Sequence, residues 1–242
     1  MTTLVKIIVT TLISLSLFSC NFDMNLNNGV RGDGNVTLEQ RAINQSYTAI
    51  KATEGLDVYL TQSTEESISV EADENLQDII ITEVIDGVLK IHTKENIGKS
   101  KSKKVMVSFK DVSSIIATSG SDVYSTNTIT TDNLELETTS GSDMKLDINT
   151  ATLNCKSTSG SDLKLSGKTI KLIAEATSGS DIKAADLIAE SSQVKATSGA
   201  DITVNTSKEL TAKATSGGDI KYLGNPEVVN KSDSSAGSIK KQ

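Results

Sequence analysis

Six aspartates recur at nearly even spacing in the second half of the chain, and they are the side chains best suited to chemistry. They are Asp122, Asp143, Asp162, Asp181, Asp201 and Asp219. Stacked carboxylates suggest calcium, but Ca²⁺ needs about six to eight oxygens around one ion. The calcium-binding β-roll gathers them with a repeat of about nine residues, whereas this period is about twice as long and each copy carries one carboxylate. We therefore predict no metal site and no cofactor, with bound calcium as the alternative.

Lysines follow four of these acids by two residues, which places them on the same face of a strand. They are Lys145, Lys164, Lys183 and Lys221. Their charges would offset the repulsion between stacked acids without a metal. In this structural interpretation, Asp and Ser side chains also satisfy backbone groups at a glycine-containing bend.

Catalytic motifs are scarce. The one histidine, His92, has no cluster of Cys, Asp or Glu around it at metal-ligand spacing. The sequence lacks a Gly-x-Ser-x-Gly elbow and a phosphate loop, and its Ser-Gly-Ser copies are too numerous to be nucleophiles. With four Tyr, three Phe and no Trp, platforms for stacking sugars are few. We predict that the protein is not an enzyme, and a glycan-active enzyme is the least favoured alternative.

The acidic balance disfavours nucleic acid as a partner. The formal net charge is −7, and the only basic cluster is a predicted loop at Lys99, Lys101, Lys103 and Lys104. A phosphate-backbone partner would require a basic stripe. Cys155 lies between Leu153 and Ser157 on a predicted inward face, where a buried thiol is the expected outcome.

The aspartates belong to a repeat that must position them. Copies of Thr-Ser-Gly-Ser-Asp, or of a close variant, begin at Thr118, Thr139, Thr158, Thr177, Thr197 and Thr215, at intervals of 21, 19, 19, 20 and 18 residues. A period near 20 residues is typical of a stacked solenoid, in which no unit can bury its apolar face alone.

Apolar and polar residues alternate around each copy, which predicts strands. One inward ladder should consist of Val123, Met144, Leu163, Ile182, Ile202 and Ile220. We predict an all-β fold, a single-stranded parallel β-helix with about 20 residues per coil divided among roughly three short strands.

The β-helix domain is expected at 41–242. Residues 41–110 would hold degenerate N-terminal coils, because Ala52–Val58 shares the skeleton of Ala117–Val123. Further strands are predicted at 67–71, 78–84, 88–92 and 105–109, capping that end. Residues 111–224 hold the regular coils. Residues 225–242 would form a C-terminal cap with a worn copy at Ser235–Lys240.

The N-terminus resembles a bacterial lipoprotein signal peptide. Lys6 precedes an apolar run that ends in Leu17-Phe18-Ser19-Cys20. This resemblance implies a signal at 1–19, lipid attachment at Cys20 and a flexible tether at 20–40, with an ordinary secretory signal as the alternative. The apolar run would span only about 18 Å as a helix, too short to cross a bilayer.

The repeats, the segment Ile50–Leu60 and the Gly224-Asn225-Pro226 sequence together resemble a family of Bacteroidetes cell-envelope proteins, the auto-transporter adhesins with a head GIN domain. The resemblance covers Arg41–Gln242. It implies a right-handed, pectin-lyase-like β-helix and an adhesin role.

We therefore expect an adhesin anchored to the cell envelope as an outer-membrane lipoprotein, with surface exposure and assembly into a trimer left open. Its partner would be a host or matrix protein or a glycan, and the alternative is a structural scaffold without a ligand. The candidate outward face consists of Thr118, Asp122, Thr139, Asp143, Thr158, Asp162, Thr177, Asp181, Thr197, Asp201, Thr215 and Asp219.

Overall fold

Strict alternation of apolar and polar residues makes each repeat a strand. In β11 (Asp143–Thr158), Met144, Leu146 and Ile148 are buried while Lys145 between them is exposed. The alternation shifts phase at Ala151 and Thr152, where the strand bends around a corner. The computed structural model describes residues 29–242, so the predicted signal peptide at 1–19, Cys20 and the first part of the tether lie outside the described residues.

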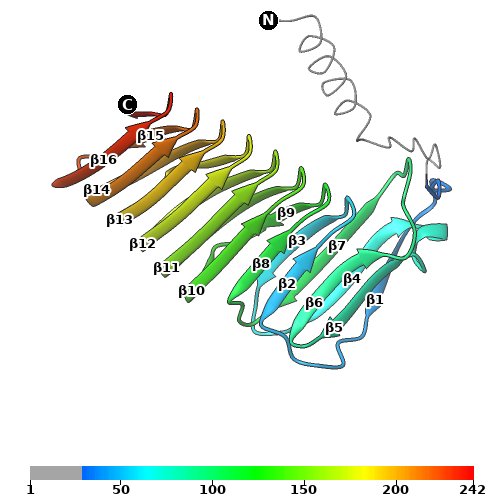
Figure 1. Cartoon of the computed structure of the whole chain (residues 1–242). Helices are drawn as coiled ribbons and strands as arrows, with labels where there is room; N and C mark the ends of the chain where they lie inside the picture. The colour runs from blue at the N-terminus through cyan, green and yellow to red at the C-terminus, as the bar shows by residue number, and fades with distance from the viewer. Residues whose placement is uncertain (1–28) are drawn as a thin grey trace, which may run out of the picture.

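The strands stack in parallel and in register into a β-solenoid of about seven turns, roughly 19 residues apart (Figure 1). This confirms the predicted fold class. The N-terminal elements are β1 (Val36–Arg41), β2 (Ala49–Ala52), β3 (Asp57–Gln62), β4 (Ser67–Asp73), the short 3-10 helix η1 (Glu74–Leu76), β5 (Ile80–Ile85), β6 (Val88–Thr93), β7 (Lys103–Phe109), β8 (Ser114–Ala117) and β9 (Asp122–Ser125). The remaining elements are β10 (Ile129–Thr138), β11, β12 (Asp162–Thr177), β13 (Asp181–Thr197), β14 (Asp201–Thr215), β15 (Asp219–Leu223), β16 (Val228–Ser234) and β17 (Ser238–Lys241).

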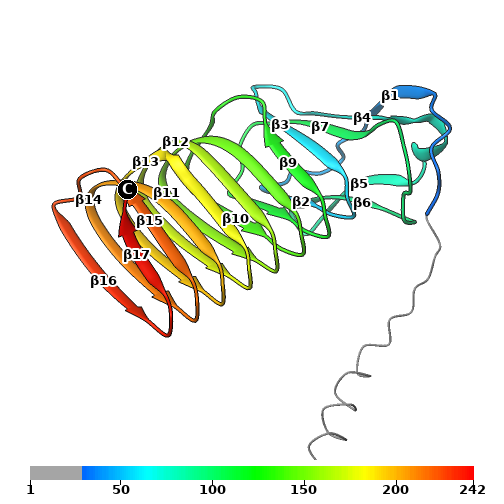
Figure 2. The ribbon, with the colours of Figure 1, turned by 90° about the horizontal axis from the view of Figure 1, so that it is seen from above.

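Each regular coil is one long strand and one tight corner, not the three short strands predicted. Pairing continues around the bend, because Asp143 lies opposite Asp162 at one end of β11 and Thr158 opposite Thr177 at the other. Figure 2 shows these coils from above as narrow, evenly spaced loops. The narrow interior suits the aliphatic and small residues that the sequence supplies.

The core is a set of ladders of stacked apolar side chains. The predicted inward ladder is confirmed, and its members Val123, Met144, Leu163, Ile182, Ile202 and Ile220 are each at most 1% exposed. They pair with one another across successive rungs. Cys155 is also buried inward, as predicted, opposite Leu136 and Ala174.

The first rungs do not follow chain order. The rung of β2 and β3 lies between two rungs that come later in the sequence, because β2 pairs with both β6 and β8. In the same way, β3 pairs with both β7 and β9. The predicted degenerate copy at Ala52–Val58 is therefore a true rung, placed inside the stack and not at its end.

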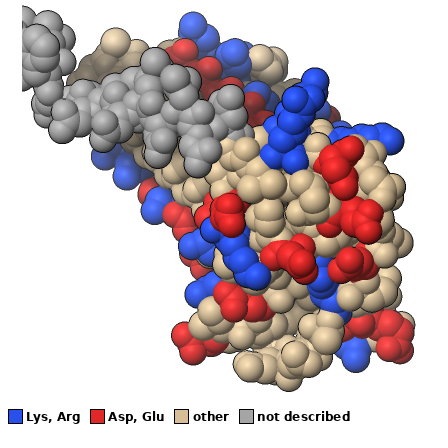
Figure 3. All heavy atoms as spheres, turned by 90° about the vertical axis from the view of Figure 1, so that its right-hand side faces the viewer, with Lys and Arg blue, Asp and Glu red and all other residues tan. Residues whose placement is uncertain are grey.

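Antiparallel strands close the N-terminal end, where Figure 3 shows acidic and basic side chains interspersed. Strand β4 pairs with β7 on one side and with β1 on the other. The prediction that residues up to 40 form a tether is thus wrong from Val36 onward. Pairing with β4, which lies far along the chain, orders these residues. The sequence gives little indication of this strand, because one of its faces is exposed and its apolar Leu38 is 60% exposed.

A buried carboxylate fastens the residues before β1 to this end. Asp73 is fully buried and accepts hydrogen bonds from the backbone N–H groups of Gly34, Lys101 and Ser102 at 2.8, 3.0 and 2.9 Å. Although burial works to raise the pKa of Asp73, these donors hold it below its ordinary value. The folded body therefore begins within residues predicted as tether.

Residues 225–242, predicted as a C-terminal cap, form one further rung. Strand β16 pairs with β14 and β17 pairs with β15, both in parallel. Two inward positions of this rung are charged, because Lys231 lies opposite Ala212 and Asp233 opposite Ala214. Charged residues at inward positions suit a terminal rung, since they discourage further strand pairing.

Candidate binding face at the repeat corner

Each Thr-Ser-Gly-Ser copy makes a tight corner with two residues in the left-handed region. At the first copy, φ is 55° at Ser119 and 70° at Gly120, and Ser121 N–H donates to the Thr118 carbonyl at 3.3 Å. Two central residues with positive φ are the mark of a type I′ turn. The Gly120 N–H donates to the Ser140 carbonyl of the next rung at 3.1 Å, so the corners also stack.

The second serine, present in the first four copies, points inward and ties one rung to the previous one. In the copy at Thr177, Ser180 is fully buried, and its Oγ donates to the Thr177 carbonyl at 2.9 Å and to the Ser157 carbonyl at 2.7 Å. Ser121 and Ser142 make equivalent bonds to Ala52 and Ala117. The predicted use of serine to satisfy backbone groups is confirmed.

The predicted outward residues form two ladders that flank the corner. Thr158, Thr177, Thr197 and Thr215 lie opposite one another at the ends of the strands that enter it. The six aspartates pair in register at the start of the strands that leave it. Threonines and aspartates are therefore brought to one edge of the solenoid, on opposite sides of the Ser-Gly tip.

The aspartate ladder contains a member that the predicted site residues omit. Asp57 lies opposite Asp122 and extends the ladder by one rung. The sequence does contain a signal for Asp57. Ala52–Val58 shares its pattern with Ala117–Val123, and this alignment places Asp57 where the other copies have their aspartate. Among residues 29–242, none of the seven carboxylates accepts a backbone hydrogen bond, so the predicted use of aspartate to satisfy backbone groups at the bend is wrong. The turn itself depends on serine and glycine.

A second ladder runs beside the aspartates, two residues further along each strand. In rung order it consists of Tyr59, Tyr124, Lys145, Lys164, Lys183, Thr203 and Lys221. We call the surface made by this ladder and the aspartate ladder the aspartate face. Its side chains lie on the strands that follow the corner, at positions that alternate with those of the buried inward ladder.

Charge compensation on the aspartate face is local. Lys183 Nζ lies 2.7 Å from Asp162 and 3.2 Å from Asp181, and the first of these contacts is the main cause that raises the pKa of Lys183. Among residues 29–242, the other lysines of this ladder have no ion pair. The predicted compensation of the aspartates by lysines is thus seen at one place, where Lys183 bridges Asp162 and Asp181.

Near both ends of the aspartate ladder, burial and repulsion between carboxylates together outweigh the nearby lysines. Burial raises the pKa of Asp122, and the charges of Asp143 and Asp57 add to the effect. Burial also raises the pKa of Asp201, with further contributions from Asp181 and Asp219. Both carboxylates are therefore held in surroundings that disfavour their charged form.

Two tyrosines begin the second ladder. The rings of Tyr59 and Tyr124 stack with centroids 5.3 Å apart and planes 28° apart. The predictions missed this pair, although each tyrosine follows an aspartate by two residues as the lysines do. Beside it lies a hollow of about 300 Å³.

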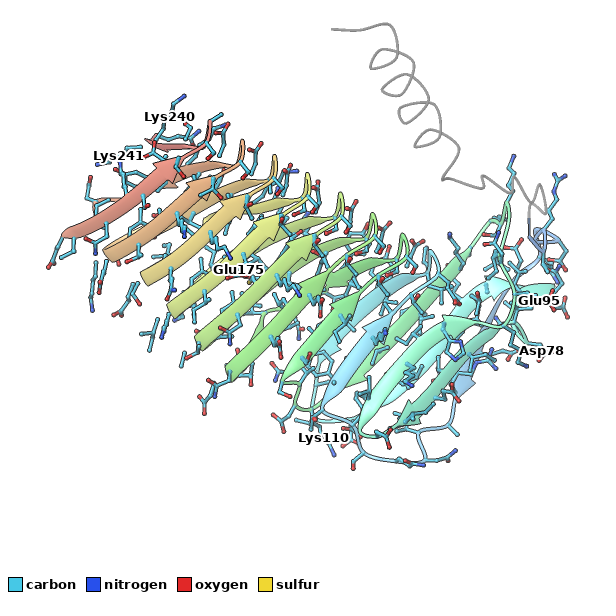
Figure 4. All side chains as sticks on the ribbon, in the orientation of Figure 1. Asp78, Glu95, Lys110, Glu175, Lys240 and Lys241 are labelled. Atoms are coloured by element: carbon cyan, nitrogen blue, oxygen red, sulfur yellow. The ribbon has the colours of Figure 1, made fainter. Side chains whose placement is uncertain are left out.

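The face on the other side of the corner carries ion pairs across the rungs. Lys156 lies 3.7 Å from Glu137, and Lys195 lies 3.7 Å from Glu175. Figure 4 shows Glu175 projecting outward from the middle of the stack. Acid and base alternate from Glu137 to Lys195 on this ladder, before Lys213 follows, whereas on the aspartate face they occupy separate ladders.

The remaining candidates lie apart from the aspartate face. His92 Nε2 contacts Glu83 at 2.9 Å on the β5–β6 hairpin. The predicted lysine loop ends earlier than expected, because Lys103 and Lys104 already belong to β7 and Lys104 contacts Glu71 at 3.2 Å. Residues 29–242 hold no group of three or more His, Cys, Asp or Glu placed to share a metal ion.

A family model described as "Putative auto-transporter adhesin, head GIN domain" matches residues 46–226, which include every complete Thr-Ser-Gly-Ser-Asp copy. The chain belongs to this family. In this head GIN domain the matched region begins just before β2 and ends after β15, so it contains the whole aspartate face.

Solved structures share the fold of this head GIN domain. A "putative adhesin" from Bacteroides fragilis NCTC 9343 superposes with a TM-score of 0.81 at 23% identity, covering 88% of this chain and 100% of that one. A "putative lipid binding protein" from Parabacteroides distasonis ATCC 8503 gives 0.71 at 22% identity, covering 88% and 99%. A "putative adhesin" from Parabacteroides merdae ATCC 43184 gives 0.71 at 18% identity, covering 88% and 98%. No curated protein matches the chain.

The described part of this head GIN domain contains no helix with the length and apolar character needed to cross a bilayer.

Proposed function

We propose that the protein is a cell-envelope adhesin, held to the membrane by lipid on Cys20, that binds a protein or glycan partner through its aspartate face. The observation that carries this proposal is the register of the face. The same carboxylate recurs on successive rungs at positions that pair directly, on a chain that belongs to a family named for adhesion.

Repetition gives the face its binding mechanism. Neighbouring strands lie about 4.8 Å apart, so carboxylate and ammonium groups repeat at that interval along the solenoid. A partner with its own repeating groups can make one weak contact at each rung, and linked weak contacts gain affinity through multivalency. A rigid, in-register ladder favours such binding because little order is lost when the partner binds.

The position of the predicted anchor supports this role. The described chain starts at the antiparallel end of the molecule, and the regular rungs extend away from it (Figure 1). Lipid on Cys20 would therefore hold that end near the membrane and project the aspartate face outward. The anchor lies outside the described residues and needs its own test.

The anchor is tested by labelling cells that express the full chain with a radioactive fatty acid. We expect label on the wild-type protein and none on Cys20→Ser. Protease treatment of intact cells then reports which side of the membrane the solenoid occupies. Protection of the solenoid from protease would place it away from the cell surface and exclude adhesion to host surfaces.

The binding face is tested with a triple variant, Asp162→Asn, Asp181→Asn and Asp201→Asn, in the full chain displayed on cells. We expect these cells to lose adhesion to surfaces coated with matrix proteins or glycans. The matched control neutralises three acids across the corner, Glu135→Gln, Glu137→Gln and Glu175→Gln, and should adhere like the wild type.

Circular dichroism must show that both triple variants are folded. Equal adhesion by both would remove the aspartate face from the mechanism. No adhesion by the wild type to any coated surface would favour the scaffold interpretation instead.

A further inference from the structure

Aromatic side chains are gathered at one place on the surface of the solenoid. Among residues 29–242 the aromatic residues are Tyr47, Tyr59, Phe109, Tyr124 and Tyr222. Tyr47, Phe109 and Tyr222 are buried, with at most 6% of each exposed. The half-buried rings are the stacked Tyr59 and Tyr124, and both belong to the aspartate face.

The hollow beside this pair spans consecutive rungs. It has a volume of about 300 Å³ and is lined by Tyr59, Tyr124, Ser125, Thr126, Lys145, Leu146, Asp147 and Ser166. Lys145 lies opposite Tyr124 on the next rung, and Ser166 lies opposite Asp147 on the rung after that. Its size is at the lower end of the range of ligand sites, about 300–1,000 Å³.

Polar groups in the hollow are held in fixed positions. Asp147 accepts hydrogen bonds from the hydroxyls of Thr128 at 2.7 Å and Ser166 at 3.4 Å, and its backbone N–H donates to Ser125 Oγ at 2.8 Å. Lys145 has no ion pair among residues 29–242, unlike Lys183 on the same ladder. The hollow thus offers a fixed acceptor and an uncommitted donor next to an aromatic ring.

This combination fits a sugar ring. A pyranose presents an apolar C–H face that stacks on an aromatic ring, and its hydroxyls both donate and accept hydrogen bonds. The surrounding charge favours a neutral sugar. Burial raises the pKa of Tyr124, and the nearby carboxylates of Asp122, Asp57 and Asp143 add to the effect. Together with Asp147, these carboxylates outnumber the single ammonium group of Lys145 in the lining of the hollow, so an anionic sugar would meet mainly like charge.

We propose that the hollow beside Tyr124 binds a neutral pyranose unit of a glycan, with the ring stacked on Tyr124 and its hydroxyls bound by Lys145 and Asp147. The proposal rests on the adhesin function above and specifies its ligand class. The first rungs of the aspartate face then recognise one sugar, and the lysine and aspartate ladders beyond it contact the rest of the partner.

A larger hollow elsewhere on the surface is less suited to this ligand. It has a volume of about 920 Å³ and lies at the opposite corner of the coils, lined mainly by short polar side chains with the exposed Ile170 and Ile188. It contains no aromatic ring among its lining residues.

Glycan arrays that carry neutral oligosaccharides of glucose, galactose, mannose and N-acetylglucosamine, probed with the purified full chain, test the proposal. Titration of a bound oligosaccharide can be followed by tyrosine fluorescence, because the chain has four tyrosines and no tryptophan. We expect Tyr124→Leu to weaken binding by about tenfold and Tyr124→Phe to retain it.

Two lysine variants form a matched pair. Lys145→Thr and Lys213→Thr each remove one exposed lysine charge from a strand, Lys145 on the aspartate face and Lys213 across the corner from it. Lys145 lines the hollow and Lys213 does not, so Lys145→Thr should weaken binding and Lys213→Thr should not. Thermal unfolding confirms that each variant is folded.

Three outcomes would overturn the inference. Folded Tyr124→Leu that binds like the wild type means that the tyrosine pair only stabilises the strand pairing. Equal loss in both lysine variants means that binding depends on charge alone. Absence of neutral oligosaccharide binding, while cells still adhere through the aspartate face, leaves the adhesin function standing and removes the sugar from it.

Discussion

At the scale of single residues, the repeat assigns separate tasks to side chains that look alike in the sequence. The first serine of each copy adopts positive φ, from 52° to 59° in the six copies, at the exposed corner. The second serine is buried in the first four copies and binds the carbonyls of the corner. The aspartate that follows faces outward and takes no part in the turn, so it is free to serve a surface role.

Ser180→Ala should lower the free energy of unfolding by about 1 kcal/mol. The substitution removes the buried hydroxyl that donates to the Ser157 carbonyl of the previous rung at 2.7 Å. Alanine fits the site, because Ala200 occupies it in the next copy and is fully buried there. Urea unfolding measures the change, and an unaltered midpoint would show that the inward hydroxyls contribute no stability.

Asp201→Asn should stabilise the protein at neutral pH, by less than about 1 kcal/mol. The folded pKa of Asp201 is raised, first by burial and then by Asp181 and Asp219. An acid with a raised folded pKa costs stability above that pKa, and the cost disappears as the pH falls below the unfolded value of about 3.9.

The difference in melting temperature between Asp201→Asn and the wild type should therefore be positive at pH 7 and vanish near pH 3. Thermal unfolding across this pH range measures it. If the melting temperature of Asp201→Asn exceeded that of the wild type more at pH 3 than at pH 7, the assignment of a raised pKa to Asp201 would be wrong.

At the scale of elements, glycine is required for two different reasons. Gly160 at a corner has φ of 68°, and an added Cβ would meet nothing within 4 Å. Gly167 within β12 has φ of 105°, and an added Cβ would lie 2.0 Å from the Ile148 carbonyl oxygen of the previous rung. Gly160 is needed only for its left-handed backbone conformation. Gly167 is also needed because there is no room for a Cβ atom between adjacent rungs.

Gly160→Ala and Gly167→Ala should therefore differ in their effect on stability. The first should cost about 1–2 kcal/mol, the usual penalty for a left-handed non-glycine residue. The second should cost about 3 kcal/mol or more, because adjacent rungs must move apart. Denaturant unfolding of both variants gives the comparison, and equal costs would show that the rungs separate easily at Gly167.

The sequence predicts the coils well and the first rungs poorly, for a physical reason. Alternation around each copy is local, so the strands, the inward ladder and buried Cys155 could be predicted without knowing what pairs with what. The place of β2 and β3 between later rungs, and the pairing of β1 with β4, depend on long-range contacts that no local pattern encodes. The tyrosine pair was missed because its two members are far apart in the sequence and meet only through that rung order.

At the scale of the whole molecule, each coil acts as a unit of length. Thr158 lies opposite Thr177, and Ser157 lies opposite Ala176. Removal of residues 158–176 therefore joins Ser157 to Thr177 with the ladders still aligned. Since stability in a solenoid is roughly a sum over units and their interfaces, a molecule shorter by one unit should fold.

The deletion of 158–176 should give a folded protein that is less stable and shorter by about 5 Å. Circular dichroism and small-angle scattering measure these properties. The matched control deletes only 158–167, which removes one corner and fuses two coils into one that no longer matches its neighbours, and it should not fold cooperatively. Failure of both deletions to fold would mean that the coils are not interchangeable.

The order of the first rungs also governs how the molecule can assemble. The β2–β3 rung takes its two neighbours from β6–β7 and β8–β9, so a chain that emerges from its N-terminus cannot complete both neighbours until Ser125 has appeared. Each later coil can pair at once with the exposed strand edge of the rung before it. Assembly should then be nucleated late and slowly at this end and proceed quickly by addition afterwards. Such a delay would suit the envelope location proposed above, because a polypeptide that crosses a membrane unfolded must stay extended on the way.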